Sequence, residues 1–359
     1  MTSRTINRRI VIVEPNSSGH HFYYVRLLAE RALQKSQDCE VVLLTTEASR
    51  NSREYQIHLA RISKLKTTCL SSDDFRLSNL SSNPLVRDSA QVSFPESDKL
   101  LFQIALGHWK ISAPTTFLVM RPDGEPRKIK GLGYLVGLSK KFLIIASNLR
   151  SNIKVYGLKS PISKRKAPIP WLSDPITLNT IEGKIEEYRS ILDELAPRFW
   201  IGVFGYITPR KNLNLVIGSI SNRKDIGLVI AGTLDNEVQE SLKFQLQSMK
   251  DEHRLFVISG PLDDSSLDSA IAAVDIVVAA HSNGGPSGIV AKAASLGKPL
   301  ALAGAKSLRT DSKNLGTQAR WTKLDANRIS VSVDVLSKSG PFKSVRYDSG
   351  QDFSRKLLP

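Results

Sequence analysis

The stretch Val274–Gly304, VDIVVAAHSNGGPSGIVAKAASLGKPLALAG, predicts a strand, a glycine-rich loop, a helix and a second strand. Ile276–Ala280 is a short, β-branched apolar run typical of a buried parallel strand. Ile289–Leu296 is predicted to form a helix that ends at Gly297. In such a unit the loop places unpaired backbone N–H groups at a helix N-terminus, where they stabilise an anion. The stretch therefore favours a phosphate-binding loop, with a plain tight turn as the alternative.

The same alternation of strands and helices surrounds this stretch. Phe199–Phe204 predicts a strand and Leu213–Ser221 a helix, with further strands at Gly227–Ala231 and Leu255–Ser259. At the start of the chain, a strand, a loop, the helix Phe22–Lys35 and another strand follow one another. This pattern predicts an α/β protein with two Rossmann-like, doubly wound domains facing a cleft. Ligands of such sheets bind beyond the carboxyl ends of the strands, where these loops lie.

The middle of the chain suggests where the domains divide. Four prolines between residues 160 and 180 indicate a linker. We therefore expect an N-terminal domain over residues 1–170, a second domain over 171–325 and a helical tail over 326–359 that packs back on the first domain. Just before the linker, the sequence predicts a helix at 133–140, a strand at 142–146 and a short helix at 147–157.

Composition limits the classes of protein. The chain of 359 residues is 41% hydrophobic, and no apolar run approaches the roughly 18 residues of a transmembrane helix. The N-terminus enters a strand directly, which argues against a signal peptide. The two cysteines, Cys39 and Cys69, show no metal-binding spacing. These features indicate a cytoplasmic protein.

The net charge of +16 is unevenly spread along the chain. Residues 121–166 hold 12 basic and two acidic residues. A solvated face, an anionic substrate or an anionic membrane surface would each explain this block. Nucleic acid is not expected, because no binding motif is present and aromatic residues are only 7% of the chain. The apolar run 131–137 beside Lys140 and Lys141 fits either an interfacial helix at a membrane or a core helix.

The chain resembles retaining glycosyltransferases of the GT-B fold, specifically the large family 4 class. Three blocks carry the resemblance: WIGVFGYITPRKNLNLVIGSI (200–220), LVIAGTLD (228–235) and the region from Leu255 to Gly304. The N-terminal NSSGHHFYYVRLLAERAL is similar to the family's acceptor-side glycine loop and first helix. The resemblance implies that the second domain holds a nucleotide-diphospho-sugar as co-substrate, without a metal or other cofactor.

The family has a basic pair after the first strand of the second domain, and this pair contacts the diphosphate. Lys211 matches its lysine, while Tyr206 stands directly after Gly205 where the family has its arginine. Arg210 is adjacent and could take that place. Two cations opposite a helix N-terminus would neutralise a leaving diphosphate, although a solvated Arg-Lys turn is the alternative.

The nucleotide-sugar loop departs from the family at two positions. The family usually has two glutamates eight residues apart, and the alignment through Gly297 places Gly284 and Lys292 there. Lys292 cannot accept hydrogen bonds from ribose hydroxyls, but it can pair with a phosphate. The other residues assigned to the donor site are as follows: His281, Asn283, Gly285, Ser287 and Gly288.

The acceptor side offers candidates from the first domain. Gly19, His20 and His21 form the loop before the first helix, where a histidine could orient a sugar hydroxyl. Glu96 and Asp98 follow a predicted strand and, with His20, are the candidate catalytic residues. Structural histidines and exposed loop carboxylates are the alternatives.

These observations lead to two hypotheses. The first is a glycosyltransferase that moves a sugar, with retention, to a glycan or lipid-linked acceptor in polysaccharide or glycoconjugate biosynthesis. It would act in the cytoplasm, with peripheral attachment at the inner face of the membrane left open. The second is a protein of the same fold that binds a nucleotide sugar or glycan as a partner or scaffold subunit without turnover.

Overall fold

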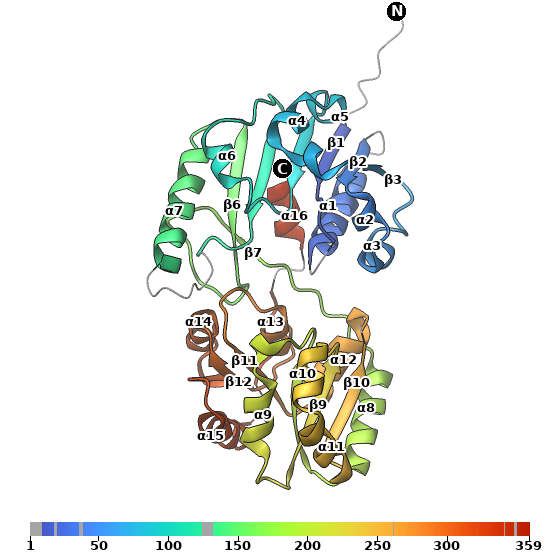
Figure 1. Cartoon of the computed structure of the whole chain (residues 1–359), viewed down its shortest axis with the longest axis vertical. Coiled ribbons are helices and arrows are strands. Elements are labelled where there is room, and N and C mark those ends of the chain that lie inside the picture. The colour runs from blue at the N-terminus through green and yellow to red at the C-terminus, as the bar shows by residue number, and fades with distance from the viewer. Residues whose placement is uncertain are drawn as a thin grey trace, which may run out of the picture. The chain divides into compact units, whose positions relative to one another are not determined.

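The computed structural model describes residues 9–17, 20–35, 39–123, 132–260, 262–340, 342–347 and 350–359. The chain divides into two compact units. Unit 1 comprises the residues up to 159, 165–173 and 350–359, and unit 2 comprises 160–164 and 174–349. Figure 1 shows that each unit is a sheet with helices on both faces.

Unit 1 is built on a parallel sheet whose seven strands have the order β3-β2-β1-β4-β5-β6-β7 within the described residues. The chain runs outward from β1 to β3 on one side and from β4 to β7 on the other, so the strand order reverses between β1 and β4. The register pairs Val11 of β1 with Val42 of β2 and with Val92 of β4. The strands are β1 (Arg9–Val13), β2 (Glu40–Thr45), β3 (Leu65–Cys69), β4 (Gln91–Phe94), β5 (Thr115–Val119), β6 (Ile153–Lys159) and β7 (Trp171–Ser173).

Two apolar layers cover the faces of this sheet. Successive residues of a strand point to opposite faces, and accordingly Val11 and Val13 belong to one core while Ile10 and Ile12 belong to the other. The helices of unit 1 are α1 (His21–Lys35), α2 (Glu47–Arg50), α3 (Arg53–His58), α4 (Leu77–Ser82), α5 (Pro84–Arg87), α6 (Leu101–Ala105), α7 (Leu132–Ser147) and α16 (Gln351–Leu357), with the 3₁₀ turn η1 (Ser72–Phe75).

Unit 2 contains a second parallel sheet, of six strands in the order β10-β9-β8-β11-β12-β13 among the described residues. Its strand order reverses between β8 and β11, which pair at Ile201–Ile276 and Gly202–Val277. The strands are β8 (Phe199–Phe204), β9 (Ile226–Gly232), β10 (Leu255–Ser259), β11 (Ile276–His281), β12 (Leu300–Gly304) and β13 (Ala319–Thr322).

The helices of unit 2 alternate with its strands, as the sequence pattern predicts, with α8 before β8 and two helices after β9. They bury two further apolar cores against the sheet, one on each face. The helices are α8 (Glu182–Glu194), α9 (Leu213–Ile220), α10 (Asn236–Ser241), α11 (Lys243–Asp251), α12 (Asp264–Ala273), α13 (Gly288–Ser295), α14 (Lys306–Leu315) and α15 (Ala326–Ser337), with the 3₁₀ turns η2 (Pro209–Lys211) and η3 (Gly316–Gln318).

The segment 132–159 corrects two sequence predictions. The predicted strand at 142–146 belongs to the 16-residue helix α7, and the predicted helix at 147–157 is largely replaced by strand β6. The apolar, β-branched run FLIIA suggests a strand in isolation. In the structure it continues the helical face that begins before Lys140, because no proline or glycine interrupts the helix there.

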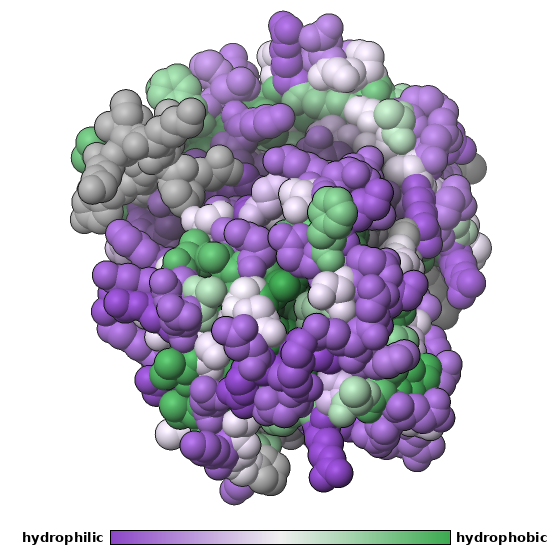
Figure 2. Space-filling model, turned by 60° about the horizontal axis from the view of Figure 1, so that its bottom comes forward, coloured by the Kyte–Doolittle hydropathy of each residue, from purple (hydrophilic) through white to green (hydrophobic). Residues whose placement is uncertain are grey.

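The described surface is mainly polar. Figure 2 shows a face on which hydrophilic side chains predominate and hydrophobic ones form smaller areas. Within the described ranges, every helix is too short or too polar to cross a lipid bilayer.

Candidate functional site

The loop after β8 folds Lys211 back over the end of its own strand. Gly205 adopts a φ of 81°, a conformation that residues with a Cβ rarely adopt. The Lys211 ammonium donates a 2.6 Å hydrogen bond to the Phe204 carbonyl. A Cβ on Gly205 would lie 3.4 Å from Lys211 Nζ, so the glycine leaves room for the lysine head.

Hydrogen bonds fasten this loop to the loop after β11. The Arg210 carbonyl accepts from the Ser282 amide at 2.9 Å, and Arg210 Nη1 donates to Asn283 Oδ1 at 3.3 Å. Asn212 donates its side-chain amide to the carbonyls of Arg210 and Ala280, at 2.9 and 2.8 Å. The basic pair therefore lies at the carboxyl ends of β8 and β11, where the strand order of unit 2 reverses and where ligands of such sheets bind.

The electrostatics of this edge are positive. Burial, followed by the positive charge of Arg210, lowers the pKa of Lys211 to about 8. Burial lowers the pKa of His281 to about 4, with Lys211 and Arg210 acting in the same direction. His281 is therefore neutral at neutral pH, while Lys211 remains mostly protonated and would gain most from an anionic partner.

Helix α13 begins beside this edge. Ser287 is its N-cap, and its hydroxyl accepts from the Val290 amide at 3.5 Å. The first turn, starting at Gly288, presents N–H groups that have no intrahelical acceptor. A Cβ built on Gly284 or on Gly285 would meet no atom within 4 Å. The loop thus borders open space at Gly284 and Gly285.

Two predicted donor residues point toward other partners. Lys292 Nζ lies 2.7 Å from Asp268 Oδ1 and 3.4 Å from Asp264 Oδ1. Asp268 is fully buried and also accepts from the Asn179 amide. Tyr206 donates its hydroxyl to Asp235 at 2.9 Å, and this bond raises the pKa of the phenol. Lys292 therefore joins α13 to α12, and its charge is neutralised there.

Unit 1 holds a buried acid–histidine pair at its own point of reversed strand order. Glu14 follows β1 and is fully buried, and His21 Nδ1 lies 2.9 Å from Glu14 Oε2. Burial raises the pKa of Glu14, although His21 opposes this. Burial lowers the pKa of His21, but Glu14 and Glu96 raise it, and the net pKa lies above its usual value. The pair can hold and orient a proton at this edge of the sheet.

The other acceptor-side candidates have varied surroundings. Glu96 accepts a hydrogen bond from the Asp98 amide. Its negative charge helps to raise the pKa of both Glu14 and His21. Asp98 accepts from the Met120 amide and pairs with Lys140 of α7, both at 2.6 Å, so it fastens the end of β5 to that helix. His20 is exposed and stacks on Tyr24. Gly19 lies outside the described residues.

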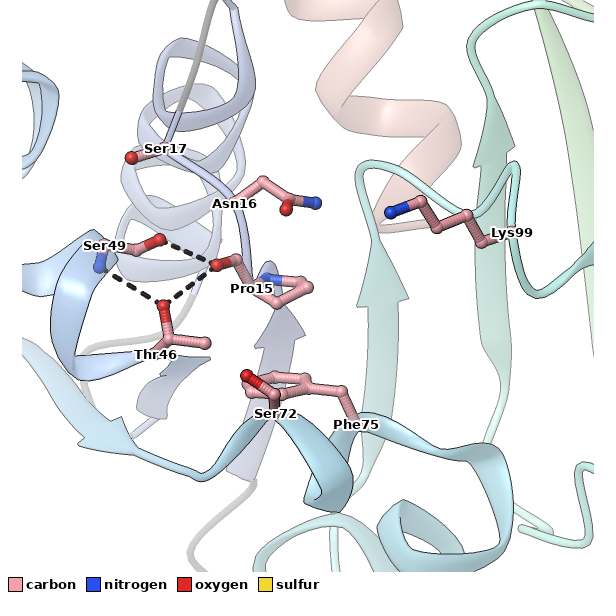
Figure 3. Close-up of a pocket in the computed structure, with 8 residues that line it drawn as sticks. All are labelled: Pro15, Asn16, Ser17, Thr46, Ser49, Ser72, Phe75 and Lys99. Atoms are coloured by element: carbon pink, nitrogen blue, oxygen red, sulfur yellow. Dashed lines mark hydrogen bonds between the residues drawn. The ribbon is translucent and has the colours of Figure 1, made fainter.

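A cavity of about 500 Å³ opens at the same edge of unit 1. Figure 3 shows Lys99 reaching toward Asn16, with the ring of Phe75 beside Pro15. The Thr46 and Ser49 hydroxyls donate to the Pro15 carbonyl at 3.1 and 2.7 Å, which fixes the loop after β1 to the start of α2. The cavity is lined by Pro15, Asn16, Ser17, Thr46, Ser49, Ser72, Phe75 and Lys99.

Sequence reasoning missed Glu14, Asp268 and the cavity. An acidic residue directly after the buried strand RIVIV was the only local signal for Glu14. Asp268 and Lys292 are 24 residues apart, so nothing in the local pattern reveals their contact. In the described part of the chain, no group of three or more His, Cys, Asp or Glu side chains could hold a metal ion.

Comparison with known proteins gives a structural likeness only. No protein-family model and no curated protein sequence matches the chain. Similar solved structures include HepE from Anabaena with UDP-glucose, with a TM-score of 0.60 and 13% identity over 97% of this chain and 95% of that chain. Others are a glycosyltransferase from Rickettsia africae (TM-score 0.65, 11% identity, 98% of this chain and 93% of that chain) and sucrose-phosphate synthase from Thermosynechococcus elongatus (0.58, 12%, 98% and 94%). At these identities the likeness establishes the fold, and it confirms the prediction: this chain has the two doubly wound α/β units of GT-B glycosyltransferases.

Proposed function

We propose that this protein is a glycosyltransferase that moves a sugar from a nucleotide-diphospho-sugar to a glycan or lipid-linked acceptor. One observation carries the proposal: Arg210 and Lys211 are fastened to the loop after β11 at the point of reversed strand order in unit 2. Two cations and the first turn of α13 are suited to a diphosphate. The fold shared with UDP-sugar-bound HepE adds support.

The donor reaction follows from this charge arrangement. When the bond between sugar and diphosphate breaks, negative charge develops on the leaving phosphate. Lys211, Arg210 and the α13 amides would stabilise that charge, which lowers the barrier to bond cleavage. We propose that this set replaces a metal ion. The neutral His281 and the amide of Asn283 would then bind hydroxyl groups of the sugar.

The acceptor is assigned to unit 1. Hydroxyl and amide side chains in the cavity suit the hydroxyl groups of a glycan, and the ring of Phe75 offers an apolar platform for one face of a sugar. Lys99 would attract a phosphate or carboxylate on the acceptor. These features favour an anionic glycan or a phosphate-linked lipid, in polysaccharide or glycoconjugate biosynthesis. We place this activity in the cytoplasm, at the inner face of a membrane.

We propose that the sugar is transferred with retention of its anomeric configuration, as in the family 4 enzymes that the sequence resembles. In that reaction the leaving phosphate can accept the acceptor proton. The buried Glu14–His21 pair favours a second mechanism, in which His21 removes the proton and the sugar inverts. Proton NMR of the first product distinguishes the two, because retention leaves the anomeric configuration of the donor unchanged.

The donor site is tested by binding. Isothermal titration calorimetry with a panel of UDP-, GDP- and ADP-sugars should identify one donor. Lys211→Ala should then weaken its binding by about 1.5–3 kcal/mol, as expected for a charged hydrogen bond. Lys250→Ala removes an exposed lysine from α11 and should change nothing. Equal affinity of Lys211→Ala and wild type would remove the lysine from the site.

A binding protein without turnover is the second candidate. It is favoured by Gly284, which leaves the first family glutamate absent, and by the engagement of Lys292 with Asp268. Both candidates predict donor binding, so a hydrolysis and transfer assay with the identified donor separates them. Binding without any hydrolysis or transfer, across a panel of glycan and lipid-phosphate acceptors, would support the binding protein.

A further inference from the structure

Helix α7 exposes a continuous apolar stripe. Leu135, Leu138, Phe142, Ile145 and Leu149 follow one another at intervals of three and four residues, which places them along one side of the helix and its C-terminal turn. Phe142 is 70% exposed and Leu149 is 83% exposed. The opposite side of α7, including Gly137 and Ile144, is buried in unit 1.

The neighbouring helix enlarges this surface. Helix α6 packs against α7, as Figure 1 also shows. It exposes Phe102 to 61%, and Leu106 at its C-terminal end is 57% exposed. Single exposed apolar residues are common, but seven on two packed helices form the kind of patch that marks an interaction site. We call these seven residues the α6–α7 surface.

The segments that contain and flank the α6–α7 surface are rich in basic residues. Residues 98–123 and 132–159 contain eight basic residues and two acidic residues, Asp98 and Asp123. Asp123 is paired with Lys141, and Lys140 is paired with Asp98. The Arg150 guanidinium lies beside Gly107 at the end of α6. An anionic partner complements this region, whereas a second copy of a chain with a net charge of +16 would be repelled.

We propose that the α6–α7 surface rests on an anionic lipid bilayer, with its apolar side chains in the interfacial region. Apolar burial and attraction to anionic headgroups act together in such binding. The Lys140–Asp98 pair links α7 to the carboxyl ends of β4 and β5. The bilayer contact would therefore lie on the helix that supports the acceptor side of unit 1. The inference deepens the proposed membrane location and rests on it, but it does not require sugar transfer.

The test is vesicle flotation of the full chain. Wild type should float with vesicles that contain phosphatidylglycerol, less so at high salt, and should not float with pure phosphatidylcholine. The double variant Phe142→Ser/Leu149→Ser should reduce partitioning about tenfold or more, because two large apolar side chains no longer enter the interface. Phe244→Ser removes an 87% exposed phenylalanine from unit 2 and should float like wild type. Thermal melting checks that all variants are folded.

Three results would overturn the inference: wild type that does not float, a double variant that floats like wild type, or equal binding to both lipids. A wild-type dimer in solution that the double variant converts to monomer would instead assign the surface to a second copy. Donor binding measured without vesicles on the same samples keeps the two proposals apart. If no donor binds but flotation is normal, sugar transfer is rejected while the proposed membrane contact still stands.

Discussion

The two units have the same kind of sheet, but they place different residues where the strand order reverses. In unit 2 this edge carries Arg210 and Lys211, glycines and a helix N-terminus, and its field is positive. In unit 1 the corresponding edge holds the buried Glu14–His21 pair and a cavity lined with hydroxyl groups. The contrast teaches that the fold supplies only the position of such an edge, while the residues after each strand set its charge and its hydrogen-bonding groups.

Reversing the charge of Lys292 should have the largest effect on stability. In Lys292→Glu a carboxylate would lie beside Asp268, which is fully buried and would lose the Lys292 ammonium that lies 2.7 Å away. We expect a loss of about 3–5 kcal/mol in the free energy of unfolding, measured with urea. Lys250→Glu, on an exposed face of unit 2, should change it by less than about 0.5 kcal/mol. If Lys292→Glu lost no more stability than Lys250→Glu, the Lys292–Asp268 pair would have no structural role.

The pH dependence of donor binding sharpens the assignment of the anion to unit 2. Lys211 has a pKa of about 8, so its protonated fraction falls from about nine-tenths at pH 7 to about one-tenth at pH 9. Donor affinity should therefore fall about tenfold over this interval in calorimetry. Lys211→Arg keeps its charge throughout, and its affinity should stay nearly constant. Identical profiles for the two proteins would argue against a role for the lysine charge.

The acid–histidine pair makes the stability of unit 1 depend on pH. The pKa of Glu14 is raised from 4.5 and that of His21 from 6.5, so both groups bind protons more tightly in the folded chain. Their contribution to the free energy of unfolding is fully present below the pKa values of the unfolded chain. It is lost as the pH rises through the pKa values of the folded chain. Wild type should lose about 1 kcal/mol between about pH 5 and about pH 8 in urea unfolding.

Glu14→Gln should flatten this profile, because it removes one titrating group and the carboxylate that raises the His21 pKa. The control is Glu30→Gln, which changes an exposed carboxylate on α1 and should keep the wild-type slope. If Glu14→Gln kept that slope as well, the pair would not be the source of the pH dependence.

Introducing the missing family glutamate should have the smallest effect on folding. A Cβ at Gly284 would meet no atom within 4 Å, so Gly284→Glu should change the free energy of unfolding by less than about 0.5 kcal/mol. Comparing Gly284→Glu with Lys292→Glu shows at which of the two family positions the fold tolerates a glutamate. Destabilisation by several kcal/mol would mean that the loop is packed more tightly than the structure indicates.

The sequence predicted most of the strands and the loops after β8 and β11, because their signals are local. The apolar runs of β8 and β11, the loop glycines and the Arg210-Lys211 pair can be recognised within a few residues. The helix predicted at 133–140 is the first half of α7, but the second half of α7 could not be recognised in this way. Its exposed face is as apolar as its buried face, so the helical period is masked and the run at 142–146 suggests a strand. An interaction surface thus obscured the pattern that would have revealed the helix.

The acceptor side was less predictable because it depends on contacts between distant residues. Asp98 looks like a loop carboxylate in sequence, but it accepts hydrogen bonds from Met120 and Lys140. Glu14 and His21 are close in sequence, but the sequence does not show that Glu14 is buried and lies 2.9 Å from His21. Propensity and spacing carry no information about such burial.

Helix α16 has a consequence for how the protein is made. It follows all of unit 2 in the chain, but it packs against α1. There the ring centroids of Phe353 and Tyr24 lie 4.8 Å apart, and Leu357 is fully buried. The Leu357 carbonyl also accepts the hydroxyl of Thr116 on β5. During synthesis unit 2 is therefore complete first, while the earlier-translated unit 1 waits with an open apolar face for its last helix. A ribosome that stops before α16 releases a complete unit 2 attached to an unfinished unit 1.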